Sequence, residues 1–164
     1  MKTLITILGP ENSGKTTLMW TVYEKLVAAN NTPHTIWVAN SCHELTTPHS
    51  RVYKPSRKLW DFKAMINIDG VELYIASAGD AIEYIDSAVS FNADIVFTAI
   101  RIRTRSKIIK TEEYYNTEIK PKYSPIEFIS CKYNAPQKIS EQNDQLADEI
   151  VSAIMKEVQK ITNL

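Results

Sequence analysis

The sequence has little of what marks secreted or membrane-spanning proteins. Its two cysteines, Cys42 and Cys131, are too few for a disulfide framework and suggest a reducing compartment. No apolar run approaches the ~20 residues that a membrane-spanning helix needs. The apolar run over 4–8 is too short for a secretion signal, and no internal repeat or low-complexity segment is present. These absences favour a single cytoplasmic globular domain over residues 1–164 without membrane association.

The chain also lacks an excess of charge of either sign. Nineteen basic and nineteen acidic residues give a formal net charge of zero, which argues against a protein that coats nucleic acid. A structural zinc site is not expected either. Cys42, His43 and His49 lie close in sequence, but four ligands at zinc-like spacing are missing.

Against this background one stretch stands out, which we call the glycine loop (residues 9–17). It fits the pattern G-x-x-x-x-G-K-[ST]. Its residues are Gly9, Pro10, Glu11, Asn12, Ser13, Gly14, Lys15, Thr16 and Thr17. A short buried strand is expected over 3–8, and a helix with apolar residues at helical spacing is expected over 15–29. Strand, loop and helix together form the context in which this pattern indicates phosphate binding.

The glycine loop with its flanks resembles the P-loop NTPase superfamily. Glycines allow consecutive backbone N–H groups to approach an anion closely, and the helix N-terminus adds partial positive charge. The resemblance implies that the loop binds the phosphates of a nucleotide. It also implies that Lys15 reaches the β- and γ-phosphates, that Thr16 ligates Mg²⁺, and that Thr17 lies near the α-phosphate.

The rest of the chain predicts an α/β three-layer sandwich of the P-loop NTPase type. Further strands are expected over 34–39, 62–68, 71–77, 94–100 and 126–131, and further helices over 81–89, about 107–119, and 142–161. Asp69-Gly70 predicts a hairpin, and therefore one antiparallel strand in a mostly parallel sheet. Pro121 and Pro125 are expected to bracket a turn. Loops at the carboxyl ends of the strands should converge on one site.

Asp80 is the candidate carboxylate for Mg²⁺ or for orienting the nucleophile. It ends the segment 77–80, after a strand that we expect beside the strand of the glycine loop. This segment is similar to the D-x-x-G region of Ras-like GTPases, except that Ala76 stands where that family has its aspartate. The alternative role for Asp80 is to cap the following helix, and the two roles can coexist.

Three arginines, Arg101, Arg103 and Arg105, follow a near-continuous apolar run at alternate positions. In an extended chain alternate side chains share a face, so the three form a candidate phosphate-binding comb. The arrangement loosely resembles the lid arginines of small-molecule and nucleotide kinases. A solvated basic loop, or ion pairs with Glu112 and Glu113, is the alternative.

No regular element is expected over 40–60. Its last part, residues 51–60, is rich in basic and aromatic side chains, which suit either an acceptor, base or phosphate clamp or a solvated loop. The N-K-x-D motif with which Ras-like GTPases read guanine is missing from 99–103, and 129–132 matches their S-A-K loop only weakly. ATP is therefore favoured over GTP.

Three functions remain open at this point. The first is an Mg-dependent ATPase that acts as a switch or assembly factor, and the second is a kinase that phosphorylates a small molecule or nucleotide. The third is a non-catalytic module that binds a nucleotide or a protein partner. In the catalytic versions Lys15 and the metal neutralise phosphate charge, Asp80 orients the metal water or nucleophile, and Arg101 or Arg103 stabilises the transition state.

Overall fold

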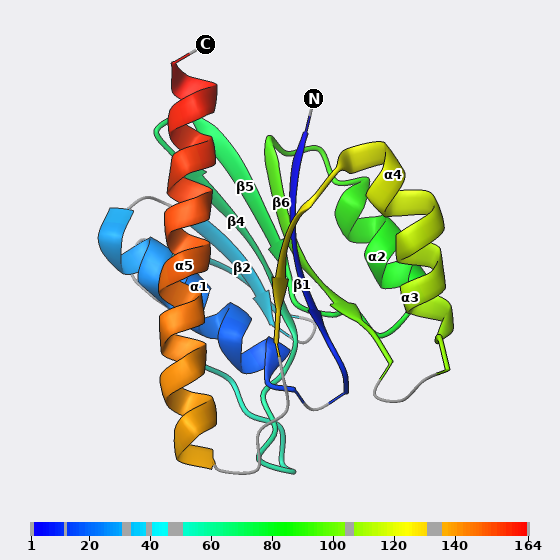
Figure 1. Ribbon diagram of the computed structural model, residues 1–164. Coiled ribbons are helices and arrows are strands. Elements are labelled where there is room, and N and C mark those ends of the chain that lie inside the picture. Colours follow the sequence, from blue (N-terminus) through cyan, green and yellow to red (C-terminus); the bar gives the residue numbers. More distant parts are fainter. Residues whose placement is uncertain are drawn as a thin grey trace.

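The computed structural model describes residues 2–11, 13–30, 34–38, 41–45, 51–103, 107–130 and 136–163, with the side chains of 41–45 and 136–142 left out (Figure 1). Its strands are β1 (Thr3–Gly9), β2 (His34–Val38), β3 (Ser41–Leu45), β4 (Phe62–Ile68), β5 (Val71–Ala76), β6 (Ile95–Arg101) and β7 (Ile126–Ile129). Its helices are α1 (Lys15–Asn30), α2 (Ile82–Val89), α3 (Lys110–Tyr114), the π-helix η1 (Tyr115–Ile119), α4 (Lys120–Tyr123) and α5 (Pro136–Thr162).

The strands form one seven-stranded sheet in the order β3-β2-β4-β5-β6-β1-β7. Strands β5, β6, β1 and β7 pair in parallel. Strand β4 is antiparallel to both β5 and β2, and β3 is antiparallel to β2. The described sheet therefore has two antiparallel strands where the sequence predicted one. Strand β6 also lies between β1 and β5, so the expectation that the Asp80 strand adjoins the glycine-loop strand is wrong.

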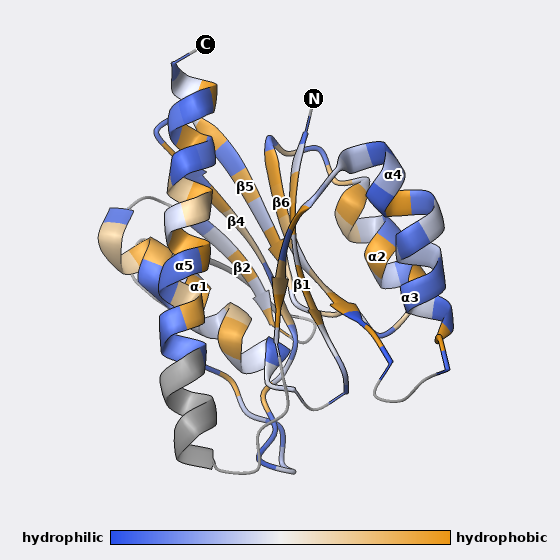
Figure 2. Cartoon of the chain, viewed as in Figure 1, coloured by the Kyte–Doolittle hydropathy of each residue, from blue (hydrophilic) through white to orange (hydrophobic). Residues whose placement is uncertain are grey.

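Helices cover both faces of the sheet and make three layers, as expected. Helices α1 and α5 lie on one face, and α2, α3, η1 and α4 lie on the other (Figure 1). Strand β1 shows why this arrangement forms: Ile5 and Ile7 belong to the core cluster under α1 and α5, whereas Leu4 belongs to the cluster under α2. Burial on both faces explains the unbroken apolar pattern of the central strands. Over the coloured part of α5, Figure 2 shows both hydrophobic and hydrophilic residues, and the hydrophobic residues Ala147, Ile150, Ile154 and Val158 are buried in the core.

The Asp69-Gly70 hairpin is confirmed. Both residues have positive φ, 52° for Asp69 and 86° for Gly70, as a two-residue turn of type I′ requires. The turn fixes the pairing of β4 with β5, in which Ile68 lies opposite Val71 and Lys63 lies opposite Ala76. This register decides which residues of the two strands meet at the far end of the hairpin.

The largest differences from expectation are one added strand and two helix bounds. Strand β3 occupies part of 40–60, where we expected no regular element. Pro121 lies in the first turn of α4, where a missing N–H costs little, so the helical segment continues to Tyr123. Helix α5 begins at Pro136 and not at 142, because proline suits a first helical position. The polar residues 140–144, which were expected to mark its start, therefore lie within the helix. None of the described helices is both long and apolar enough to cross a membrane.

Candidate functional site

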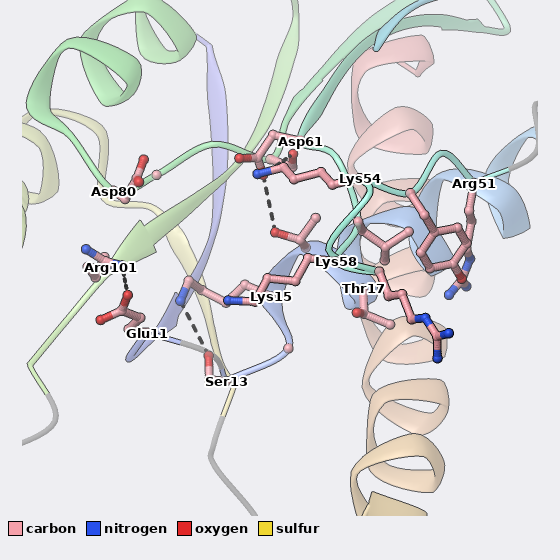
Figure 3. Close-up of a pocket in the computed structure, with 17 residues that line it drawn as sticks. Glu11, Ser13, Lys15, Thr17, Arg51, Lys54, Lys58, Asp61, Asp80 and Arg101 are labelled. Carbon is pink, nitrogen blue, oxygen red and sulfur yellow. Dashed lines mark hydrogen bonds and ion pairs between the residues drawn. The ribbon is translucent and has the colours of Figure 1, made fainter. Parts of the chain in front are cut away.

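A cleft of about 590 Å³ opens where β1, β5 and β6 end. Strand β4 runs in the opposite direction to β5, so its beginning lies at the same edge of the sheet. The residues that line the cleft are Glu11, Ser13, Gly14, Lys15, Thr16, Thr17, Arg51, Tyr53, Lys54, Arg57, Lys58, Leu59, Asp61, Ser77, Gly79, Asp80 and Arg101 (Figure 3). The expected convergence of the glycine loop, the 77–80 segment and the first arginine is therefore found.

Lys15 lies at the centre of the described part of the glycine loop. Its Nζ donates hydrogen bonds to the carbonyl oxygens of Gly9, at 2.9 Å, and Pro10, at 2.6 Å. Gly14 has a φ of 86°, a conformation that side chains rarely allow, and it turns the chain directly into α1. The loop thus holds the lysine ammonium against its own backbone. Asn12 lies outside the described residues.

The surroundings of Lys15 lower its pKa to about 8. Burial is the main cause, and the nearby positive charge of Arg101 acts in the same direction. The carboxylates of Asp80, Glu11 and Asp61 oppose the shift without cancelling it. An anionic ligand in this part of the cleft would therefore be stabilised by a cation whose charge the protein only partly compensates.

Ser130 anchors the glycine loop from outside it. This residue follows β7 and is buried, with 2% of its surface exposed. Its Oγ donates a hydrogen bond of 2.7 Å to the carbonyl oxygen of Ser13, and its N–H donates one of 2.8 Å to Leu8. The sequence assigns no such role to Ser130, because the contact depends on β7 lying beside β1.

Asp61 is the carboxylate that contacts the helical end of the glycine loop. Its Oδ1 accepts hydrogen bonds from the Thr16 hydroxyl, at 3.2 Å, and from the Ser77 hydroxyl, at 2.9 Å. The Ser77 hydroxyl also accepts a bond of 2.8 Å from the N–H of Phe62, which fixes Ser77 against the start of β4. Sequence reasoning overlooked Asp61. The hairpin register was the available signal: Lys63 pairs with Ala76, so the next position outward sets Phe62 opposite Ser77 and leaves Asp61 next to that pair.

Asp80 also lines the cleft, with an exposed side chain. It does not cap α2: the N-cap residue is Ala81, and no side chain caps the helix there. Gly79 brings Asp80 to this position by packing directly on β6, since a Cβ at Gly79 would lie 1.9 Å from the carbonyl oxygen of Ala99. Of the two roles considered for Asp80, the cap is excluded. Its position in the cleft is compatible with the other role, which is to bind Mg²⁺ or orient the nucleophile.

The predicted arginine comb divides after its first member. Arg101 is the last residue of β6 and lines the cleft, where it forms an ion pair of 3.0 Å with Glu11. Arg103 does not line the cleft and pairs instead with the largely buried Glu112 of α3, at 3.4 Å. The alternative of an ion pair with Glu112 thus holds for Arg103. Arg105 lies outside the described residues.

Residues 51–60 form a second wall of the cleft, which we call the basic hairpin. Tyr53 and Leu59 pair as an antiparallel bridge, and the N–H of Lys54 donates a bond of 2.7 Å to Lys58. Arg51 anchors one end through a 2.7 Å ion pair with Glu24 of α1. This part of 40–60 is therefore a compact hairpin and not an irregular loop.

Comparison with known proteins does not identify this site. The chain matches no family model, no curated protein and no solved structure. Among the side chains that the structure describes, no three or more of His, Cys, Asp and Glu gather in a way that would hold a metal ion. The cysteine and histidines considered for zinc, at 42, 43 and 49, fall outside the described side chains.

Proposed function

We propose that this chain is a P-loop NTPase that binds the magnesium complex of a nucleoside triphosphate, ATP in preference to GTP, and hydrolyses its γ-phosphate as a switch or assembly ATPase. The observation that carries the proposal is the joint position of Lys15, Thr16 and Asp61 in one cleft at the ends of parallel strands. Clefts in this position are the usual ligand sites of open α/β sheets. The volume of about 590 Å³ lies in the range of small-molecule sites.

The residues present fit a magnesium ion. Mg²⁺ takes oxygen ligands, usually one or two from the protein, and completes its shell with water and phosphate oxygens. Thr16 and Asp61 supply a hydroxyl and a carboxylate oxygen 3.2 Å apart, and Asp80 adds a second carboxylate to the same cleft. When bound, the ion would neutralise charge on the β- and γ-phosphates.

The protein's own groups would supply the remaining chemistry. The Lys15 ammonium, already close to the loop carbonyls, would turn toward the β- and γ-phosphate oxygens. Arg101 would stabilise the charge that develops on the γ-phosphate, with Glu11 holding it in place until the ligand binds. Asp80, exposed on the side of Arg101 (Figure 3), is the group available to orient the attacking water.

The proposal is tested by titrating the protein with ATP and GTP in the presence of Mg²⁺ and by measuring phosphate release. Lys15→Ala should abolish nucleotide binding or turnover, whereas Lys63→Ala, which removes an exposed lysine from β4, should not change either. Unchanged nucleotide affinity in Lys15→Ala would refute the proposal. Binding without turnover would leave the non-catalytic module as the function of the site.

A kinase is the second candidate, because the basic hairpin forms a cationic wall beside the glycine loop. Hydrolysis requires no such wall, whereas a negatively charged acceptor would bind to it. ADP formation that depends on an added acceptor would favour the kinase over the switch ATPase.

A further inference from the structure

The basic hairpin is held in one shape by its own backbone and by α1. The N–H of Arg57 donates a bond of 2.9 Å to Lys54, and the N–H of Trp60 donates one of 2.9 Å to Val52. Arg57 has a φ of 69°, a strained conformation for a residue with a side chain, at the tip of the hairpin. At its base, the indole N–H of Trp20 donates a bond of 3.0 Å to the carbonyl oxygen of Trp60. A strained, braced tip suits a site that must hold its side chains in position.

Three cations of the basic hairpin lie together in the cleft. Lys54, Arg57 and Lys58 line the cleft, and none forms an ion pair with a described carboxylate. Other described cations form ion pairs, with Glu24, Asp144, Asp148, Glu11, Glu112, Glu127 or Glu157 as partners, and one of these cations, Arg101, also lines the cleft. Lys54, Arg57 and Lys58 therefore gather positive charge on one wall of the cleft, with no ion pair to a described carboxylate.

Aromatic side chains accompany these cations. The ammonium of Lys54 lies 4.9 Å from the centre of the Trp60 ring, a cation–π contact that restricts it. Tyr53 lines the cleft with 56% of its surface exposed, so its ring is free to stack on a flat ligand group. Figure 3 shows Arg101 and Asp80 on one side of Lys15 and Arg51 on the other. Arg51, at one end of the basic hairpin, thus lies across Lys15 from the residues proposed to act on the γ-phosphate.

We propose that the basic hairpin binds a second small ligand, a nucleoside monophosphate, next to the triphosphate. Lys54, Arg57 and Lys58 would bind its phosphate, for which a guanidinium offers paired donors, and Tyr53 would stack on its base. The confinement of the cations to a cleft of about 590 Å³ favours a small molecule over a nucleic-acid strand. The proposal deepens the second candidate function at this site, because it names the acceptor, but it concerns binding and does not require turnover.

The test uses the full chain and calorimetric titration with adenosine and thymidine monophosphate, without triphosphate. Saturable binding is expected, and the triple variant Lys54→Gln, Arg57→Gln, Lys58→Gln should weaken it at least about tenfold. The control Lys63→Gln, Lys107→Gln, Lys156→Gln removes the same charge from exposed positions outside the cleft and should change it less than about twofold. Tyr53→Ala, which alters only an exposed ring, should weaken the monophosphate but not inorganic phosphate.

Three results would overturn the proposal. The first is no binding of either monophosphate, and the second is an equal loss of Mg-ATP affinity in the hairpin variant, which would assign the cations to the triphosphate. The third is tighter binding of a thymidine oligonucleotide than of the monophosphate, lost in the same variant. Monophosphate binding that survives in a protein unable to bind Mg-ATP would refute the proposed function and leave this proposal standing.

Discussion

The Thr16 hydroxyl donates a hydrogen bond of 3.2 Å to Asp61, and Ser77 donates to the same carboxylate oxygen over 2.9 Å. The glycine loop is thereby joined to the β4–β5 hairpin through a single acceptor atom. Asp80, the carboxylate that the sequence predicted for this site, lines the same cleft and makes no bond that caps α2. The two aspartates are therefore expected to serve different purposes.

Asp61→Asn should raise the Mg²⁺ concentration that half-saturates ATP binding by about 10- to 100-fold, because it removes the negative charge beside Thr16. ATP binding in the presence of EDTA should stay unchanged. Asp80→Asn should leave the Mg²⁺ requirement within about threefold of the parent protein and lower turnover instead. The measurement is a Mg²⁺ titration of ATP binding for all three proteins. An unaltered Mg²⁺ requirement in Asp61→Asn would exclude Asp61 from the metal site.

Arg101 and Arg103 offer a matched pair of variants, because only Arg101 lines the cleft. Arg101→Ala should lower the rate of phosphate release by about 100-fold or more while ATP affinity changes little. Arg103→Ala should keep that rate but lower the free energy of unfolding by about 1 kcal/mol, since Glu112 loses its ion-pair partner and keeps only the hydrogen bond from the backbone N–H at 103. Steady-state kinetics and urea unfolding distinguish the two effects. Equal loss of turnover in both variants would show that Arg101 and Arg103 act together on the phosphate, as the arginine comb predicts.

Lys15 should make nucleotide binding depend on pH. With a pKa of about 8, the free side chain is mostly charged at pH 7 and mostly neutral at pH 9. A bound triphosphate favours the charged form, so binding must take up a proton above pH 8. The dissociation constant for Mg-ATP should then rise by up to about tenfold per pH unit above pH 8 and stay flat below about pH 7.5.

The matched variant for this prediction is Lys15→Arg, whose guanidinium stays charged throughout the range. Its affinity, whatever its absolute value, should lack the weakening between pH 8 and 9.5. Calorimetry in two buffers of different ionisation enthalpy would count the protons taken up. The lowered pKa also means that the unfolded chain binds more protons between pH 8 and 10.5, so this residue makes the unliganded fold more stable as pH rises in that window.

The sequence predicts well those features that depend on local pattern. The glycine loop is one stretch between a strand and a helix, and the Asp69-Gly70 turn needs only two residues of suitable φ. Layers and the approximate bounds of the central strands follow from hydrophobic spacing, since β6 is buried on both faces. The P-loop assignment itself stays a prediction.

What the sequence does not reveal depends on pairing between distant segments. Asp61 reaches Thr16 only because β4 runs antiparallel to β5, and Ser130 reaches Ser13 only because β7 lies beside β1. Arg103 lies outside the cleft because Glu112, nine residues later, forms an ion pair with its side chain and accepts a hydrogen bond from its N–H. Counting the hairpin register outward from Asp69-Gly70 would have placed Asp61 next to the Phe62–Ser77 pair at the end of the hairpin. The order of β1, β6 and β5 could not be obtained in this way.

Ser130 provides the sharpest test of how the glycine loop is held. Ser130→Ala removes the buried 2.7 Å bond to the carbonyl oxygen of Ser13 and leaves that oxygen without its hydroxyl donor. The free energy of unfolding should fall by about 1–3 kcal/mol, the usual cost of an unsatisfied buried acceptor. The dissociation constant for Mg-ATP should also rise, because the loop loses the contact that fixes its shape before the ligand binds.

Ser90→Ala, at an exposed serine after α2, is the control for Ser130→Ala and should change stability by less than about 0.5 kcal/mol. Thermal and urea unfolding measure the loss of stability, and ATP titration of the folded protein measures the loss of affinity. A Ser130→Ala protein that loses stability but keeps its affinity for Mg-ATP would show that the loop keeps its binding shape without this anchor.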